Sequence, residues 1–322
     1  MKFKHTFNVF IDNFSVTYKQ LLYRLIISLI SIALTAAIVI PLVNGLTTSP
    51  DFINLTEGIK EFIKNIIEGE PTNVASAAIQ IKEAFEALIN FVTDNIANIV
   101  WGVVGVTIIR LIESFFASLG NYATAAVIND RMALHANSPF ALTLIRNLKE
   151  AALYSLMYVP LSFIYDLASV AIIYLVVFRL FALLPFMYLP VQIFVAVTLF
   201  VLAISIKMTL TTDWLPSLIR GKLGQGKAFL YTFDRRKKKT LNVLSNFVVL
   251  VIIIFALNVT AILSTLGVAS LLTVPSSYVI LLSFEFVNYY DREELKYFID
   301  KNTIIKPEKE RPLTREEFFR GE

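Results

Sequence analysis

The sequence predicts an all-α, polytopic integral membrane bundle of six transmembrane helices with amphipathic interfacial helices. Of its 322 residues, 56% are hydrophobic and only 17% are charged, whereas soluble domains average about 25% charged residues. The chain also contains long apolar runs, and a helix needs roughly 20 apolar residues to cross a hydrocarbon core of about 30 Å. These observations exclude an ordinary soluble domain.

Six apolar runs follow one another along the chain. The predicted spans are residues 21–43, 95–120, 151–178, 183–206, 241–263 and 266–290. The second span is the weakest because Arg110 and Glu113 interrupt it, while the fourth and fifth contain no charged residue. The first run exceeds the roughly 7 to 15 apolar residues of a signal-peptide core, so we expect it to remain in the protein as a span.

The distribution of lysine and arginine predicts the orientation. Residues 209–240 carry eight basic side chains against two acids, and residues 45–94 carry three lysines against eight acids. Because cytoplasmic loops retain basic residues, we expect a multi-pass protein of a prokaryotic plasma membrane with both termini in the cytoplasm. Topology already accounts for the basic residues, so no nucleic-acid partner is expected.

Between the first two spans, the sequence predicts an extracytoplasmic helical hairpin over residues 51–92. Apolar residues recur every three or four positions from Phe52 to Ile67, which is typical of an amphipathic helix. The pair Glu70-Pro71 separates this helix from a second one. Two arrangements remain open: the hairpin covers the outer mouth of the bundle or lies in the membrane interface, or its helices simply pack on each other.

Three shorter amphipathic segments precede the first, third and fifth spans, at residues 7–18, 139–149 and 227–237. We expect interfacial helices there. The tail from 291 to 322 has nine acids and eight bases, which predicts a short helical continuation to Lys296 and then a solvated, disordered cytoplasmic end.

Asp166 is the first candidate for a substrate or proton pathway. It lies about 15 residues into an apolar run of about 28, near the predicted bilayer centre, where a carboxylate costs roughly 2.5 kcal/mol or more. Such a group faces water, binds a proton or cation, or accepts hydrogen bonds from other helices. A role in passage and a purely structural role both remain open.

Arg110, Glu113 and Glu285 complete the predicted pathway. Arg110 and Glu113 are three residues apart, so they share a helix face and can neutralise each other. Arg110 can instead extend to the interface or pair with Glu285. Together with Arg24, these residues would line an inner vestibule, or they form a network that only fixes helix positions.

Five consecutive basic residues before the fifth span predict contact with anionic lipid headgroups, worth about 1 kcal/mol per charge. They are Arg235, Arg236, Lys237, Lys238 and Lys239.

The composition also limits the chemistry. The chain has no cysteine and two histidines, which excludes disulfides, thiol nucleophiles and three-histidine metal sites. It also lacks the motifs GxSxG and HExxH. We therefore expect neither catalysis nor a cofactor or metal.

Six spans, cytoplasmic ends, amphipathic helices before alternate spans and a charged tail resemble the YihY/BrkB-type bacterial membrane proteins. They are also similar to the membrane domain attached to some glycerophosphodiester phosphodiesterases. The resemblance covers most of the chain, is one of architecture, and assigns no site residues.

Two functions are compatible with these features. The leading hypothesis is a protein that binds or translocates a small solute, ion or lipid through the bundle. The alternative is a noncatalytic scaffold or accessory subunit, which recruits a protein partner or forms a homo-oligomer through the outer hairpin and the tail. A polar cavity reaching Asp166 would favour passage, and a closed bundle with an exposed apolar patch would favour assembly.

Overall fold

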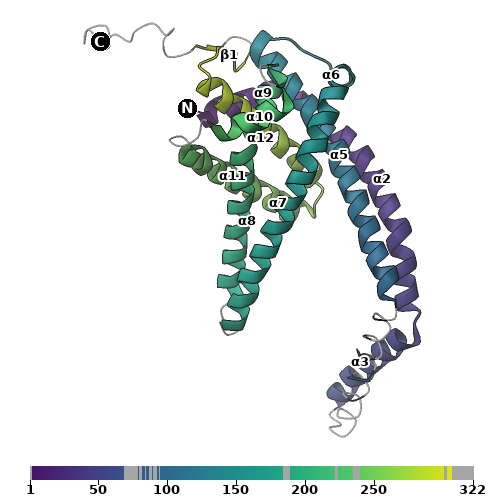
Figure 1. Cartoon of the computed structure of the whole chain (residues 1–322). Helices are drawn as coiled ribbons and strands as arrows, with labels where there is room; N and C mark the ends of the chain where they lie inside the picture. The colour runs from purple at the N-terminus through teal and green to yellow at the C-terminus, as the bar shows by residue number, and fades with distance from the viewer. Residues whose placement is uncertain are drawn as a thin grey trace. The chain divides into compact units, whose positions relative to one another are not determined.

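The computed structural model of the chain consists mainly of α-helices (Figure 1). It describes residues 2–68, 95–183, 189–221, 224–234, 240–300 and 303–306, together with 79, 82, 83, 85, 86, 89 and 93. Within this part of the chain, six helices are long and apolar enough to cross a membrane. The predicted all-α, six-span fold is confirmed.

The long helices match the predicted spans in order but extend beyond most of their limits. They are α2 (Phe14–Thr47), α5 (Ile96–Leu134), α7 (Leu148–Leu183), α8 (Leu189–Thr211), α11 (Thr240–Thr265) and α12 (Ser270–Arg292). The difference matters most in α8, which continues past the predicted end at Ile206 and so includes Lys207.

Short helices occur where the amphipathic segments were predicted. These are α1 (Lys2–Asp12), α6 (Phe140–Arg146) and α10 (Gln225–Asp234), and α9 (Trp214–Ile219) is an additional one. In the outer segment, α3 (Pro50–Glu68) is the first helix of the predicted hairpin. Most of the second predicted helix lies outside the described residues.

The chain divides into two compact units. The first comprises Met1–Leu25 and Phe115–Glu322, and the second comprises Ile26–Ser114. Both α2 and α5 therefore contribute one part to each unit.

The core of the first unit surrounds the C-terminal part of α12, in which every side chain from Leu282 to Tyr290 is buried. Helices α1, α9 and α11 pack against α12. The core is rich in large aromatic side chains, including Trp214, Phe286 and Tyr289. Each such ring buries roughly 150 to 250 Å² of surface, so this cluster supplies much of the hydrophobic stabilisation of the unit.

Helices α7 and α8 run side by side as an antiparallel hairpin in the same unit (Figure 1). Their outward side chains, such as Ile164, Leu167 and Phe194, are apolar and exposed. Contiguous apolar surface of this extent is unfavourable in water. A hydrocarbon environment removes that cost because the helical backbone satisfies its own hydrogen bonds.

In the second unit, glycines allow α2 and α5 to approach closely. A Cβ atom on Gly102 would lie 2.4 Å from Leu42, and one on Gly105 would lie 2.9 Å from Ile38. Small residues at the contact are typical of helix pairs that pack in membranes.

The start of the tail differs from its prediction. Helix α12 ends at Arg292, Glu294 adopts a positive φ of 51°, and the N–H of Leu295 donates to the carbonyl of Tyr290 at 3.0 Å. This left-handed helix end leads into an antiparallel pair, β1 (Tyr297–Phe298) and β2 (Ile304–Ile305). The expected helical continuation to Lys296 is therefore wrong, because the chain turns back and buries Tyr297 in the core.

Candidate functional site

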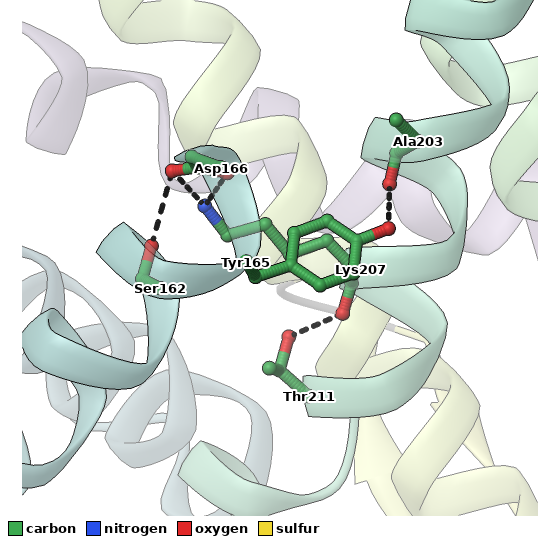
Figure 2. Close-up of polar contacts among 6 residues, drawn as sticks. All are labelled: Ser162, Tyr165, Asp166, Ala203, Lys207 and Thr211. Carbon is green, nitrogen blue, oxygen red and sulfur yellow. Dashed lines mark hydrogen bonds and ion pairs between the residues drawn. The ribbon is translucent and has the colours of Figure 1, made fainter. Parts of the chain in front are cut away.

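Asp166 of α7 forms an ion pair with Lys207 of α8 (Figure 2). The Lys207 ammonium donates to the two carboxylate oxygens at 2.8 and 2.7 Å, and the Ser162 hydroxyl donates to one of them at 3.4 Å. The side chain of Asp166 is 56% exposed, whereas that of Lys207 is 16% exposed. The candidate acid thus has a counter-ion and one open side.

Lys207 is absent from the predicted pathway because it follows the predicted fourth span by one residue. A signal for the pairing was present, since residues equidistant from the turn of an antiparallel hairpin lie opposite each other. Asp166 lies 17 residues before the end of α7 and Lys207 lies 18 residues after the start of α8, roughly 26 Å along each helix. That is close to the full hydrocarbon thickness and favours a position near one membrane face over the predicted bilayer centre.

A pocket of 140 Å³ adjoins the ion pair. Aromatic rings and Lys207 line much of it; the rings belong to Tyr158, Tyr165, Trp214 and Phe229. The ring centroid of Trp214 lies 4.8 Å from that of Phe229 and 6.0 Å from that of Tyr158.

Hydrogen bonds fix two walls of this pocket (Figure 2). The Tyr165 hydroxyl donates to the Ala203 carbonyl at 2.7 Å, and the Thr211 hydroxyl donates to the Lys207 carbonyl at 3.1 Å. The first bond holds α7 against α8, and the second lies within the last turn of α8, next to Lys207.

Glu285 lies inside the core of the first unit and is 6% exposed. In the described part of the chain, no hydrogen bond or ion pair to its carboxyl group is found. The carboxylate of Asp213 is close enough to interact with it electrostatically. Glu285 is thus the predicted pathway residue that the fold encloses without a counter-ion among the described residues.

Asp213 is 2% exposed and lies in the turn between α8 and α9. One of its carboxylate oxygens accepts a hydrogen bond from the Arg292 guanidinium. Its other oxygen, Oδ1, is buried and has no hydrogen-bond partner. Arg292 also lies 3.6 Å from Glu293, so the one guanidinium that pairs with Asp213 is shared between two carboxylates, and Glu285 has no counter-ion among the described residues.

Other buried polar atoms around the same turn also lack partners. They include the Thr212 hydroxyl, the Trp214 indole N–H and the amide nitrogen of Asn288. Asn288 shares a face of α12 with Glu285 and Arg292, because these residues are three and four apart. Unpartnered buried groups are rare in proteins and often mark the position of a water molecule or an ion.

Arg110 and Glu113 form an ion pair in the second unit, with Nη1 of Arg110 at 2.7 Å from Glu113. Glu113 also accepts hydrogen bonds from Ser31 at 2.8 Å and Ser28 at 3.2 Å. These serines were not among the predicted site residues. The carboxylate of Glu113 therefore accepts from three side chains, two on α2 and one on α5.

Arg24 belongs to the first unit, where it donates to Asn121 at 2.8 Å and lies 3.7 Å from the ring centroid of Tyr278. These contacts hold the N-terminal part of α2 against α5 and α12.

The predicted anionic-lipid contact, residues 235–239, lies outside the described residues and remains a prediction. Where the structure describes the chain, no group of three or more histidine, aspartate or glutamate residues could hold a metal ion.

Comparisons with protein-family models, curated proteins and solved structures found no match to the chain. Function is therefore inferred from the geometry of these sites and from the sequence.

Proposed function

We propose that the protein resides in the plasma membrane with both termini in the cytoplasm and passes a proton or monovalent cation through its bundle, with Glu285 as the group that takes it up. The observation that carries this proposal is the enclosure of Glu285 beside Asp213, whose charge is already paired with Arg292. An ionisable group enclosed in an apolar core is costly, and such groups cluster at functional sites.

An ionised carboxylate without a partner costs several kcal/mol in such surroundings. Glu285 therefore carries a proton or shares a cation with neighbouring oxygens. Oxygen atoms that suit a hard cation are available at Asp213 and Thr212, both of which have a buried, unpartnered oxygen. Exchange between the protonated and the cation-bound form is the elementary step of proton- or cation-linked passage.

Asp166 is not the uptake group in this proposal. Its charge is balanced by Lys207 and its side chain is mostly exposed. It therefore lacks the desolvation that would make it the uptake group, and Glu285 replaces it in that role.

Proteoliposomes that contain a pH-sensitive dye test the proposal. A potassium diffusion potential set with valinomycin should drive proton entry into wild-type vesicles faster than into protein-free vesicles. Glu285→Gln, which removes the ionisable group with little change of shape, should reduce entry to the protein-free rate. Glu57→Gln, at an exposed position of α3, is the matched control and should behave as wild type.

Chemical labelling gives an independent readout. A hydrophobic carbodiimide reacts with protonated carboxyl groups in apolar surroundings, so we expect modification of the peptide that contains Glu285. Protection by sodium ions would identify a cation as a competing ligand. Wild-type protein that shows neither ion entry nor this modification would contradict the proposal.

A specific observation favours the scaffold as a second candidate. Helix α3 lies outside the six spans and exposes Ile59, Ile63 and Ile67 on one face. If this face joins copies of the chain, Ile63→Glu should convert an oligomer into a monomer, as measured by light scattering in detergent. An unchanged mass would count against assembly through α3.

A further inference from the structure

The Asp166–Lys207 pair lies at the depth of lipid headgroups when α7 and α8 cross the membrane as one hairpin. About 17 residues, Leu167 to Leu183, separate Asp166 from the end of α7 and span roughly 26 Å, close to the thickness of a hydrocarbon core. Arg179 is the one charged residue in that stretch, and it lies near the far end. Residues 189–206 of α8 carry no charge.

Both partners of the ion pair keep unused hydrogen-bonding capacity. An ammonium has three N–H donors, of which Lys207 directs two bonds to Asp166. In the described structure, no residue accepts a bond from the third. Asp166 in turn has a side chain that is more than half exposed.

This arrangement is complementary to a zwitterion. A purely anionic ligand would meet the exposed Asp166 carboxylate, and a purely cationic ligand would meet the Lys207 ammonium. A ligand with both an anionic oxygen and an N–H cation can accept from Lys207 and donate to Asp166 at the same time.

The adjoining pocket fits part of a lipid. Its volume of 140 Å³ is several times the roughly 30 Å³ of one water molecule but well below the ~300 Å³ that encloses a drug-sized ligand. Tyrosine and tryptophan are the side chains typical of membrane interfaces, and here Tyr158, Tyr165 and Trp214 line the pocket beside Lys207.

We propose that Asp166, Lys207 and this pocket form a binding site for phosphatidylethanolamine. The phosphate accepts a hydrogen bond from Lys207, the primary ammonium of the headgroup donates to Asp166, and the glycerol region enters the aromatic pocket. Phosphatidylcholine lacks the N–H donors and phosphatidylglycerol lacks the cation, so neither satisfies both partners. The site is independent of the role proposed for Glu285.

The two tryptophans of the chain provide a direct assay. Trp101→Phe leaves Trp214, which lines the pocket, as the single tryptophan. Lipids that carry bromine on the acyl-chain carbons nearest the glycerol quench the fluorescence of a tryptophan that lies beside the glycerol region. In phosphatidylcholine bilayers, we expect brominated phosphatidylethanolamine to quench Trp214 about threefold more effectively than brominated phosphatidylcholine, the ratio typical of one exposed charged contact.

Two variants separate a lipid site from a structural ion pair. Asp166→Asn keeps the side-chain shape but weakens the acceptor, so the quenching ratio should fall to about one. Combining Asp166→Lys with Lys207→Asp restores an ion pair but exchanges the two charges, so the phosphate and the ammonium of the headgroup no longer face their partners and the quenching ratio should also fall.

Size-exclusion profiles show whether each variant is folded, and the Asp166→Asn result suffices if the exchanged pair does not fold. Equal quenching by brominated phosphatidylethanolamine and brominated phosphatidylcholine in the Trp101→Phe protein would overturn the proposal. Persistence of the phosphatidylethanolamine preference in Asp166→Asn would overturn it as well.

Discussion

Arg292, the last residue of α12, pairs with Asp213 in the turn between α8 and α9. Both side chains are largely withdrawn from solvent. Glu285 lies two turns earlier on the same face of α12, and Trp214, which follows Asp213, belongs to the aromatic core. The pair therefore joins the core to one wall of the candidate cation site.

Removal of Arg292 should destabilise the protein strongly. In Arg292→Gln, Asp213 is left as an uncompensated buried charge, and breaking a buried pair in this way costs about 3 to 5 kcal/mol. The free energy of unfolding in detergent, from denaturant titration, measures the loss.

The control for this prediction is Arg146→Gln, which breaks the pair with Asp130, where the arginine side chain is 57% exposed. An exposed pair contributes about 1 kcal/mol or less. Equal losses in the two variants would mean that Asp213 carries no charge in the folded state.

The contact between α5 and α2 at Gly120 should not tolerate even a methyl group. A Cβ atom there would lie 2.5 and 2.7 Å from two ring carbons of Tyr23, whose hydroxyl donates to the Phe116 carbonyl. Because the ring is held by this bond, Gly120→Ala should cost about 1 to 3 kcal/mol of stability. Thermal unfolding in detergent would detect the decrease.

Gly45 provides the matched comparison, since a Cβ atom at that position meets nothing within 4 Å. Gly45→Ala should leave stability unchanged or raise it by up to about 1 kcal/mol, because alanine favours the helix. A comparable loss in both variants would show that the close approach of Gly120 to Tyr23 is not what determines the result.

The hydrogen bond between Ser31 and Glu113 should appear as an energetic coupling. A double-mutant cycle of Ser31→Ala and Glu113→Gln isolates the interaction between the two side chains. Interhelical hydrogen bonds in membrane proteins contribute about 0.5 to 1.5 kcal/mol, so we expect a coupling in that range. Ser28, at 3.2 Å from Glu113 instead of 2.8 Å, should couple more weakly, and a coupling near zero for both serines would contradict the observed geometry.

The helices were predictable because each depends on an uninterrupted apolar run, which is a local property of the sequence. The predicted limits failed where they stopped at the first charge: Lys207 ends the apolar run, but the helix continues to Thr211. Helix limits depend on backbone hydrogen bonds and on partners such as Asp166, which hydropathy alone does not include.

Partners across helices were the part that the sequence could not supply. Glu113 was recognised as a costly charge, but its donors Ser28 and Ser31 lie on another helix about 80 residues away and resemble any other serine. The β-hairpin was missed for a related reason. Tyr297 follows a run of charged residues, and its burial depends on contacts with the core that arise only in the folded chain.

Single cysteines should establish the orientation of the protein, because the chain has no cysteine of its own. Lys60 of α3 and Lys227 of α10 are both exposed, and the basic residues around Lys227 favour a cytoplasmic position. On intact cells, a membrane-impermeant maleimide should label Lys60→Cys, and it should label Lys227→Cys only after permeabilisation. Labelling in the opposite pattern would invert the proposed topology. Because α8 leads through α9 to α10, the expected result would also assign the Asp166–Lys207 pair to the cytoplasmic leaflet, where its lipid partner should then be sought.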